Sequence, residues 1–429
     1  MNTLPHKVLP LRPRPRLLIQ GWRGVHHSFA MVNQHQILAL ARHGGFELHH
    51  HDVAFLMPHW NASNLDAGFD AQRQSLIASL SDLPLEQADA VLRVAAPLAA
   101  PSPASPPALT FAVTEFGLDA KGFAQPEAAL SDWTCGEHRL VTPSRWSRDR
   151  LLDFGFEEQR VHVVPHGVDG EAFSPSSAPE RDANRAVLGL GEGTVAFLNV
   201  GVPTWNKGLD LLVRAFARVH LAYPDTRLVL KDARALYGLS VEQVLRDAAA
   251  TDPAVREPAF LGAITVLPTS LTQAQLRALY GAVDCYVSPY RAEGFNLPVL
   301  EALACATPVV VSSGGATDDF CHGAGVSRIA SVFHRGDLGN KSNCCWVEPQ
   351  IDALVALMAE AASAGPNRPE TRSAQRSGAR ANALAHPWDR AADALARLLR
   401  PAAGATTSAP ASAQAFATAL PDLAGAHSI

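Results

Sequence analysis

The segment that decides the fold spans residues 285–304 and reads Cys285-Tyr-Val-Ser-Pro-Tyr-Arg-Ala-Glu-Gly-Phe-Asn-Leu-Pro-Val-Leu-Glu-Ala-Leu-Ala304. Its opening apolar run, Cys285-Tyr-Val, is typical of a short buried strand. Pro298 has no N–H group and suits the first helical position, not a helix interior. The segment therefore predicts a strand, a loop that holds Glu293, and a helix with Glu301 in its first turn.

The loop before this helix has the properties of an anion site. The first-turn amide groups of a helix have no intrahelical partner, and the positive end of the helix dipole lies behind them. Such a helix start holds anions such as a diphosphate. The carboxylates of Glu293 and Glu301 can accept hydrogen bonds from hydroxyl groups. The residues alone thus indicate a site for a phosphate joined to a polyol.

The chain on both sides of this segment alternates strands and helices. In the second half, the expected strands are Val195–Val200, Arg227–Leu230, Cys285–Val287 and Pro308–Val311. In the first half, they are Arg16–Gln20, Phe46–Asp52, Ala90–Val94, Leu109–Val113, Arg139–Thr142 and Val161–Pro165. This order predicts an α/β protein with two Rossmann-like domains, whose parallel sheets face each other across a cleft.

Composition and periodicity also suggest the domain limits. We assign residues 16–175 to an N-terminal domain, residues 194–385 to a C-terminal domain, and the polar residues 176–193 to a linker. Residues 386–400 are expected to form a helix that packs back on the body. The Pro/Arg-rich residues 1–15 and the Ala/Pro/Ser/Thr-rich residues 401–429 are expected to be disordered.

Charge and cysteine content exclude several classes. The 429 residues are 47% hydrophobic and 18% charged, with a net charge of −5, so no basic excess supports nucleic-acid binding. The six cysteines form no C-x-x-C pair, and no apolar run reaches the roughly 20 residues of a membrane span. We expect a cytoplasmic protein. Peripheral membrane contact through the basic N-terminus, with Lys7, Arg12, Arg14 and Arg16, stays open.

Four stretches of the chain resemble sequence motifs of one known protein family. Glu293-Gly-Phe-Asn-Leu-Pro-Val-Leu-Glu301 resembles the E-x7-E signature of glycosyltransferase family 4. Three further stretches resemble other parts of that family in the same order and spacing. They are Val141-Thr-Pro-Ser-Arg-Trp-Ser147, Val164-Pro-His-Gly-Val-Asp169, and Phe197-Leu-Asn-Val-Gly201 with Asn206-Lys-Gly-Leu-Asp210.

The resemblance implies a GT-B fold and a retaining, metal-independent enzyme without a cofactor. Such an enzyme moves a sugar from a nucleotide-sugar donor to a hydroxyl of a glycan, a lipid-linked or a small-molecule acceptor. Glu293 would hold sugar hydroxyls, and Lys207 would neutralise the leaving diphosphate as its charge develops. The backbone of Gly294, Phe295, Asn296 and Leu297 would face the diphosphate and the sugar. Glu301 would bind the ribose.

The chain departs from the family pattern at two positions. Val202 follows Gly201 where the family often has an arginine, and Lys231 or Arg234 are candidates to replace that cation. Ala306 stands where the family's Ala-x-Gly-x-Pro sequence has its glycine. The second departure concerns the local turn more than the chemistry.

The acceptor side is expected to lie at the strand ends of the first domain. Its candidates are Gly24, His26, His27, Glu115 and His166. The two neighbouring histidines, His26 and His27, have a competing role as a helix-capping loop, and Glu115 is either an acceptor-site or a catalytic-support residue. His166 has the alternative of an ordinary strand-end histidine.

Two other functions are compatible with the sequence. One is a GT-B nucleotide-sugar epimerase, and the other is a non-catalytic nucleotide-sugar-binding subunit, made conceivable by Val202 and Ala306. A metal at His49-His-His51 is disfavoured because alternate residues of a strand face opposite sides. The chain contains no Asp-x-Asp sequence, which argues against a metal-dependent transferase.

Overall fold

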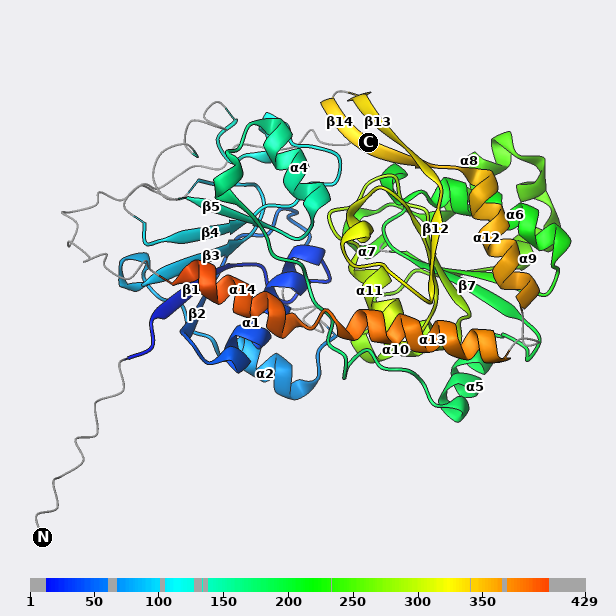
Figure 1. The fold of residues 1–429 in the computed structure, drawn as a ribbon, viewed down its shortest axis with the longest axis horizontal. Coiled ribbons are helices and arrows are strands. Elements are labelled where there is room, and N and C mark those ends of the chain that lie inside the picture. Colours follow the sequence, from blue (N-terminus) through cyan, green and yellow to red (C-terminus); the bar gives the residue numbers. More distant parts are fainter. Residues whose placement is uncertain are drawn as a thin grey trace, which may run out of the picture.

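The computed structural model describes residues 13–60, 68–100, 105–126, 133, 138–232, 234–339, 341–364 and 369–400. Two six-stranded sheets, each parallel throughout, form the centres of two α/β domains (Figure 1). The predicted fold class is therefore confirmed. Most of residues 1–15 and all of residues 401–429, for which disorder is expected, lie outside the described residues.

The N-terminal sheet has strands in the spatial order β2 (Glu47–Asp52), β1 (Arg16–Gly21), β3 (Ala90–Val94), β4 (Ala108–Phe111), β5 (Arg139–Thr142) and β6 (Val161–Val163). Its helices are α1 (Ser28–His43), α2 (Ala71–Ser79) and α4 (Arg145–Phe154). Most of the strands are nearly continuous apolar runs because helices cover a parallel sheet on both faces.

The C-terminal sheet has the order β12 (Val326–Ile329), β11 (Val309–Ser312), β10 (Cys285–Ser288), β7 (Val195–Val200), β8 (Thr226–Lys231) and β9 (Ile264–Leu267). Its helices are α6 (Leu209–Ala222), α7 (Arg234–Tyr237), α8 (Val241–Thr251), α9 (Pro258–Gly262), α10 (Gln273–Ala282), α11 (Leu297–Ala304) and α12 (Ile351–Ala364). The strand order reverses between β7 and β10, and ligands bind at such a switch point in open α/β sheets.

Two helices at the C-terminal end of the described chain join the domains. Helix α13 (Pro369–Leu384) packs on α11 in the second domain, and α14 (Trp388–Leu399) returns to pack on α1 in the first (Figure 1). The ion pair Arg42–Asp389 and the stacking of Trp388 on His35 fix α14 there. The predicted helix at residues 386–400 therefore packs back on the body.

An antiparallel hairpin reaches from the second domain to the first. Strands β13 (Ser331–Leu338) and β14 (Lys341–Pro349) form a separate two-stranded sheet beside α4 (Figure 1). Arg335 pairs with Asp153 of α4 at 2.8 Å, and the Cys345 N–H donates to the Phe116 carbonyl at 2.7 Å. No element was predicted for this region from the sequence.

The structure differs from the sequence predictions at the start of helix α1 and in residues 176–193. Helix α1 is capped by His27, whose ring nitrogen accepts from the Phe29 N–H, whereas Ser28 is the residue that the sequence predicts at this position. Residues 176–193 contain helix α5 (Ala178–Val187), which the polar composition does not indicate. Ser177 and Glu180 form a capping box that starts this helix.

Candidate functional site

The candidate site lies at the switch point of the C-terminal sheet. Two loops meet there: residues 201–207 after β7 and residues 289–296 after β10. Residues of both domains line the cavities beside these loops, so the site is a cleft between the domains. The position agrees with the predicted arrangement of two domains that face each other across a cleft.

Buried Asn206 joins these two loops. Its carbonyl accepts from the Arg291 N–H at 2.7 Å and from the Ala292 N–H at 3.3 Å. Its side-chain amide donates to the Ala292 carbonyl at 3.1 Å. Because both the backbone and the side chain of Asn206 are used, Lys207 and Glu293, which follow on the two loops, are held next to each other.

Arg291 anchors the same region from behind. Its guanidinium makes a bidentate pair with Asp210 at 2.7 and 2.9 Å and reaches Glu348 of β14 at 2.8 Å. The Arg291 side chain is only 5% exposed, whereas Asp210 and Glu348 are 32% and 37% exposed, so these charge-assisted bonds are shielded from water only on the arginine side. The loop that carries Glu293 is thereby fixed to α6 and to the hairpin.

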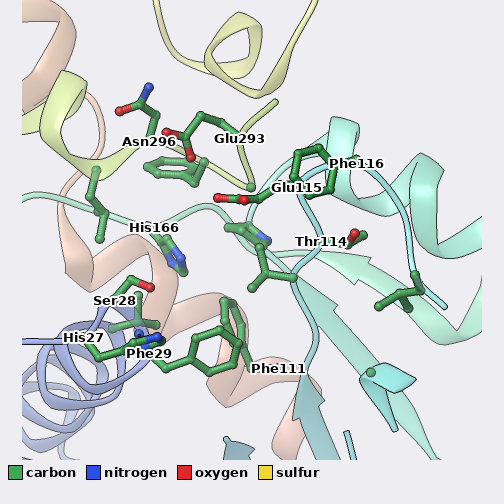
Figure 2. A pocket seen from close by; sticks show the side chains of 18 of the residues that line it. His27, Ser28, Phe29, Phe111, Thr114, Glu115, Phe116, His166, Glu293 and Asn296 are labelled. Atoms are coloured by element: carbon green, nitrogen blue, oxygen red, sulfur yellow. Dashed lines mark hydrogen bonds between the residues drawn. The ribbon is translucent and has the colours of Figure 1, made fainter. Parts of the chain in front are cut away.

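Lys207 lies between two carboxylates from different domains. Its Nζ is 2.9 Å from Oε2 of Glu293 and 2.6 Å from Oε1 of Glu115, which follows β4 in the first domain. The other oxygen of Glu115 accepts from the Asn206 amide at 2.8 Å. Figure 2 shows the carboxyl groups of Glu115 and Glu293 on the same side of the pocket, opposite His27. Glu115 is therefore a direct neighbour of the two residues with predicted catalytic roles.

Lys207, Glu115 and Glu293 are called the triad below, and the charges of Lys207 and Glu293 affect each other. Burial disfavours the ammonium form of Lys207, but the carboxylates of Glu115 and Glu293 outweigh it, so the pKa of Lys207 is raised. Burial raises the pKa of Glu293, and the neighbouring Lys207 limits that rise. Lys207 therefore stays cationic, as stabilisation of a leaving anion requires.

The helix start of α11 presents backbone amides to this cleft. Asn296, the residue before the helix, adopts a left-handed conformation with φ 79° and donates from its side chain to Ser288 at 2.9 Å. No side chain caps the helix among the described residues. Pro298 has no N–H and the Val299 N–H donates to the Asn296 carbonyl at 3.2 Å, so Leu297 is the first-turn residue whose amide can serve an anion. Gly294 is tied to the first domain because Ser144 Oγ donates to its carbonyl at 2.6 Å.

Glu301 lies deeper than expected. Helix α11 already begins at Leu297, so Glu301 stands beyond its first turn. Its carboxyl accepts a hydrogen bond from the Tyr280 hydroxyl at 2.8 Å, and it lines the larger of the two cleft cavities. Burial raises the pKa of Glu301 to about 7, against the opposing effect of the Tyr280 hydrogen bond.

The structure shows the surroundings of Val202 and Ala306, the two residues that depart from the family pattern. Val202 lines the cleft, and so does Lys231, whose pKa is lowered by burial. Arg234 is engaged with Glu242 instead and does not line the described cavities, so Lys231 is the candidate cation that lies at the cleft. Ala306 adopts φ 57°, the left-handed conformation that favours glycine, so the turn is kept at the cost of backbone strain.

Two cavities that share part of their lining fill the cleft. One of about 480 Å³ lies towards the first domain, and one of about 970 Å³ extends along residues 200–207 and past Glu301. Lys207 and Glu115 line both of them, so the triad stands at their junction. Phe295 and Asn296 line the smaller cavity and Leu297 lines both.

Most of the predicted acceptor-side residues reach these cavities. His166 lines the smaller cavity, His26 lines the larger one, and His27 lines both. Gly24 does not line either described cavity; its N–H donates to Gln34 at 3.3 Å. His27 also caps α1, as the competing interpretation predicts. It therefore lines the cavities and caps the helix at the same time.

The two histidines of the smaller cavity are uncharged near neutral pH. Burial lowers the pKa of His27 to about 4, and burial together with His35 lowers the pKa of His166 to about 3. His166 packs against Phe295 and Trp388, at ring-centroid distances of 5.0 and 5.4 Å. These rings offer neutral hydrogen-bonding groups inside a mainly apolar wall.

Several residues of the site were not predicted from the sequence. Tyr237 and Lys341 line both cavities, and Tyr280 holds Glu301. Asn206 belongs to one of the family-like stretches, and its place directly before Lys207 is a usable signal for its role. Lys341 lies on the unpredicted hairpin, so no local pattern connects it to the cleft.

Within the described ranges, no group of three or more His, Cys, Asp or Glu side chains is arranged to hold a metal ion. The three histidines of β2 diverge: His50 is buried and meets Asn33, whereas His51 meets Asp82. In the same ranges, no helix has the length and apolar character needed to cross a membrane.

The chain is similar in sequence to known glycosyltransferases. Residues 194–332 match the family model described as Glycosyl transferases group 1. D-inositol 3-phosphate glycosyltransferase 1 of Catenulispora acidiphila is 32% identical over 270 residues, which are 62% of this chain and 57% of that protein. The chain covers between 37% and 57% of the first curated relatives it matches.

Solved structures share the whole two-domain fold. The glycosyltransferase from Rickettsia africae has a TM-score of 0.64 at 12% identity, over 90% of this chain and 98% of that one. Anabaena Alr3699/HepE in complex with UDP and glucose has a TM-score of 0.63 at 13% identity, over 90% of this chain and 99% of that one. At this identity the similarity concerns the fold.

Proposed function

We propose, on the premise that this chain belongs to the group 1 glycosyltransferases with the GT-B fold, that it is a retaining transferase. It moves a sugar from a nucleotide-sugar donor to an acceptor hydroxyl. The observation that carries the proposal is the contact of Lys207 with Glu293 beside the open helix start of α11. A fixed cation, free amides and a carboxylate there match the needs of a sugar diphosphate.

The geometry supports a role for each group in the bond-breaking step. As the bond between the sugar and the diphosphate breaks, negative charge grows on the departing oxygen. Lys207 and the amides of residues 294–297 stabilise that charge most in the transition state. Glu293 accepts hydrogen bonds from sugar hydroxyls and thereby orients the reacting carbon. The acceptor hydroxyl enters from the smaller cavity, on the face of the leaving group. Its oxygen forms the new bond to the reacting carbon, and its proton passes to an oxygen of the departing diphosphate.

The larger cavity takes the nucleotide. Glu301 lies on its wall and accepts hydrogen bonds from ribose hydroxyls, and Lys231 is the cation that faces the phosphates in place of the arginine missing at Val202. The structural relative bound to UDP and glucose makes UDP-sugars the first donors to test. The proposal requires neither a metal nor another cofactor.

The smaller cavity favours an uncharged acceptor. Its charged lining residues, within the described chain, are the two lysines Lys207 and Lys341 and the three acidic residues Glu115, Asp119 and Glu293. Lys207 is already paired with two of these acids, which leaves little positive potential for a phosphate. An acceptor such as inositol 3-phosphate, suggested by the names of the relatives, therefore fits less well than a neutral hydroxyl compound.

The experiment is a donor and acceptor screen with the full chain. UDP-, GDP-, ADP- and CMP-sugars are first ranked by thermal shift, and the best donor is then incubated with glycan, lipid-linked and small-molecule acceptors. Inositol and inositol 3-phosphate form a matched pair. Glycoside formation with retained anomeric configuration supports the proposal, and inverted configuration contradicts it.

The same screen separates the two alternatives. Epimerisation of the donor without an acceptor would identify an isomerase. Binding of a nucleotide sugar with no transfer over the full acceptor panel would identify a non-catalytic subunit. The transferase names of the relatives favour neither alternative.

A further inference from the structure

An arginine-lined groove lies on the second domain, outside the cleft. Helix α13 contributes Arg372, Arg376 and Arg380, which repeat every four residues and therefore share one helix face. Together with nearby segments they line a cavity of about 800 Å³. Its remaining lining residues are Pro175, Ala306, Ser373, Ser377, Ala381 and Leu384. No carboxylate lines the groove in the part of the chain that the structure describes.

The arginines near this groove outnumber the acids that compensate them. Arg181 and Arg185 of helix α5 share the carboxylate of Asp284, at 2.7 and 3.2 Å, and Arg372 contacts the same carboxylate. Three guanidinium groups therefore share the carboxylate of one aspartate, and Asp182 is a second acid close to Arg181 and Arg185. Burial, followed by the charges of Arg376, Arg372 and Arg185, lowers the pKa of Arg181 to about 9. The cluster has an excess of positive charge that water does not fully screen.

Arg380 has a structural role at one end of the groove. Its guanidinium donates to the carbonyls of Phe173 and Ala304 at 2.6 Å and of Gly170 at 2.7 Å. These bonds tie the end of α11 to the segment that leaves the first domain. The donors of Arg380 are thus largely committed, and its charge remains.

Arg376 differs from its neighbours. It is half-buried, it lines the groove, and it has no hydrogen-bond or ion-pair partner among the described residues. A guanidinium presents five donors in a rigid planar fork. An arginine held among other arginines without a partner is electrostatically unfavourable, so an anion at this position would relieve the repulsion.

We propose that this groove is a binding site for a phosphate group, either free phosphate or a phosphate monoester. Arg376 supplies the fork, Arg372 and Arg380 supply additional charge, and the exposed hydroxyls of Ser373 and Ser377 supply neutral donors. A dianion with three equivalent oxygens suits this combination, because arginine recognises phosphate bidentately. The site is separate from the donor cleft and does not depend on the proposed transfer reaction.

The test is a calorimetric titration of the full chain with inorganic phosphate. We expect one saturable site in the wild type and an affinity about tenfold or more weaker in Arg376→Gln, because a charge-assisted hydrogen bond to the phosphate is lost. Arg376→Lys, which keeps the charge but not the fork, should be intermediate. Arg246→Gln, on the exposed part of α8, is the matched control and should match the wild type.

Further variants distinguish the groove from the donor cleft. Lack of saturable binding, or equal affinity in a folded Arg376→Gln variant, overturns the proposal. Loss of binding in Lys207→Gln instead would place the phosphate in the donor cleft and also overturns it. Sedimentation with phosphatidylcholine vesicles, with and without phosphatidic acid, identifies the source of the phosphate: Arg376-dependent capture supports a lipid headgroup, and calorimetric binding without capture supports a soluble phosphate compound.

Discussion

Lys207 Nζ lies 2.6 Å from Oε1 of Glu115, and these residues belong to different domains. The contact places a carboxylate of the first domain on the cation that is proposed to face the donor diphosphate. Glu115 and a diphosphate would therefore compete for the same ammonium group. We therefore expect Glu115 to influence donor affinity as well as the contact between the domains.

Removal of Lys207 should destabilise the fold as well as abolish transfer. Lys207→Ala leaves the buried carboxylate of Glu293 without its cation, which typically costs about 3–5 kcal/mol. Urea unfolding measures this loss. The double variant Lys207→Ala/Glu293→Gln should recover most of the stability but no activity. A single variant as stable as the wild type would show that the pair contributes little to folding.

Glu115→Gln should strengthen the binding of nucleoside diphosphates. The amide keeps a hydrogen bond to Asn206 but removes a negative charge beside Lys207, so we expect about three- to tenfold tighter binding of UDP at low salt. Asp119→Asn is the matched control, since Asp119 lines the same cavity without an ion pair to Lys207 in the described structure. Weaker UDP binding in Glu115→Gln would mean that the carboxylate supports the donor.

Glu301 should make stability depend on pH. The pKa of Glu301 is about 7 in the folded protein, compared with the ordinary value of 4.5 that applies to the unfolded chain. The folded state therefore holds the proton more tightly. The contribution of Glu301 to the free energy of unfolding is therefore largest below pH 4.5. It falls as the pH rises to about 7. The full effect is about 3 kcal/mol.

Glu301→Gln tests this assignment. The amide cannot ionise, so the variant should lose the decline in unfolding free energy between pH 4.5 and 7 and should be more stable than the wild type at pH 8. Denaturant unfolding at several pH values measures both. An unchanged pH profile would show that Glu301 ionises normally in the folded protein.

Gly294 is required by close packing between the domains. A Cβ atom at this position would overlap the side chain of Val113 on the first domain. Gly294→Ala should therefore lower the melting temperature and the transfer rate, and Gly294→Ala/Val113→Ala should restore both in large part. If the double variant is as impaired as Gly294→Ala alone, the glycine acts through the backbone and not through this contact.

The local parts of the site are predictable from sequence. The apolar run before residue 289 and Pro298 indicate a strand, a loop and a helix without any tertiary information, and the structure has these elements. The expectation that Glu301 lies in the first turn is wrong because it assigns Pro298 to the first helical position, which Leu297 occupies. Helix α5 has a signal in the sequence that the polar composition conceals, the capping-box spacing of Ser177 and Glu180.

The contacts between domains are not predictable in this way. Glu115 and Lys207 are 92 residues apart, and their approach depends on how two separate sheets are oriented. The same holds for the hairpin of β13 and β14, which brings Lys341 to the cleft. The sequence indicates a helix-capping loop at His26 and His27 but not which residue caps α1, because serine is the commoner capping residue and Ser28 follows directly.

Lys207 and its neighbours are proposed to bind a nucleotide sugar through its diphosphate. The most direct measurement is a calorimetric titration of the wild type and Lys207→Gln with UDP-glucose and the other nucleotide sugars, below the unfolding temperature of the variant. We expect saturable binding of at least one donor by the wild type, weakened about tenfold or more in the variant. Equal affinity in both proteins, or no donor binding by the wild type, would show that the chain does not bind a nucleotide sugar through Lys207.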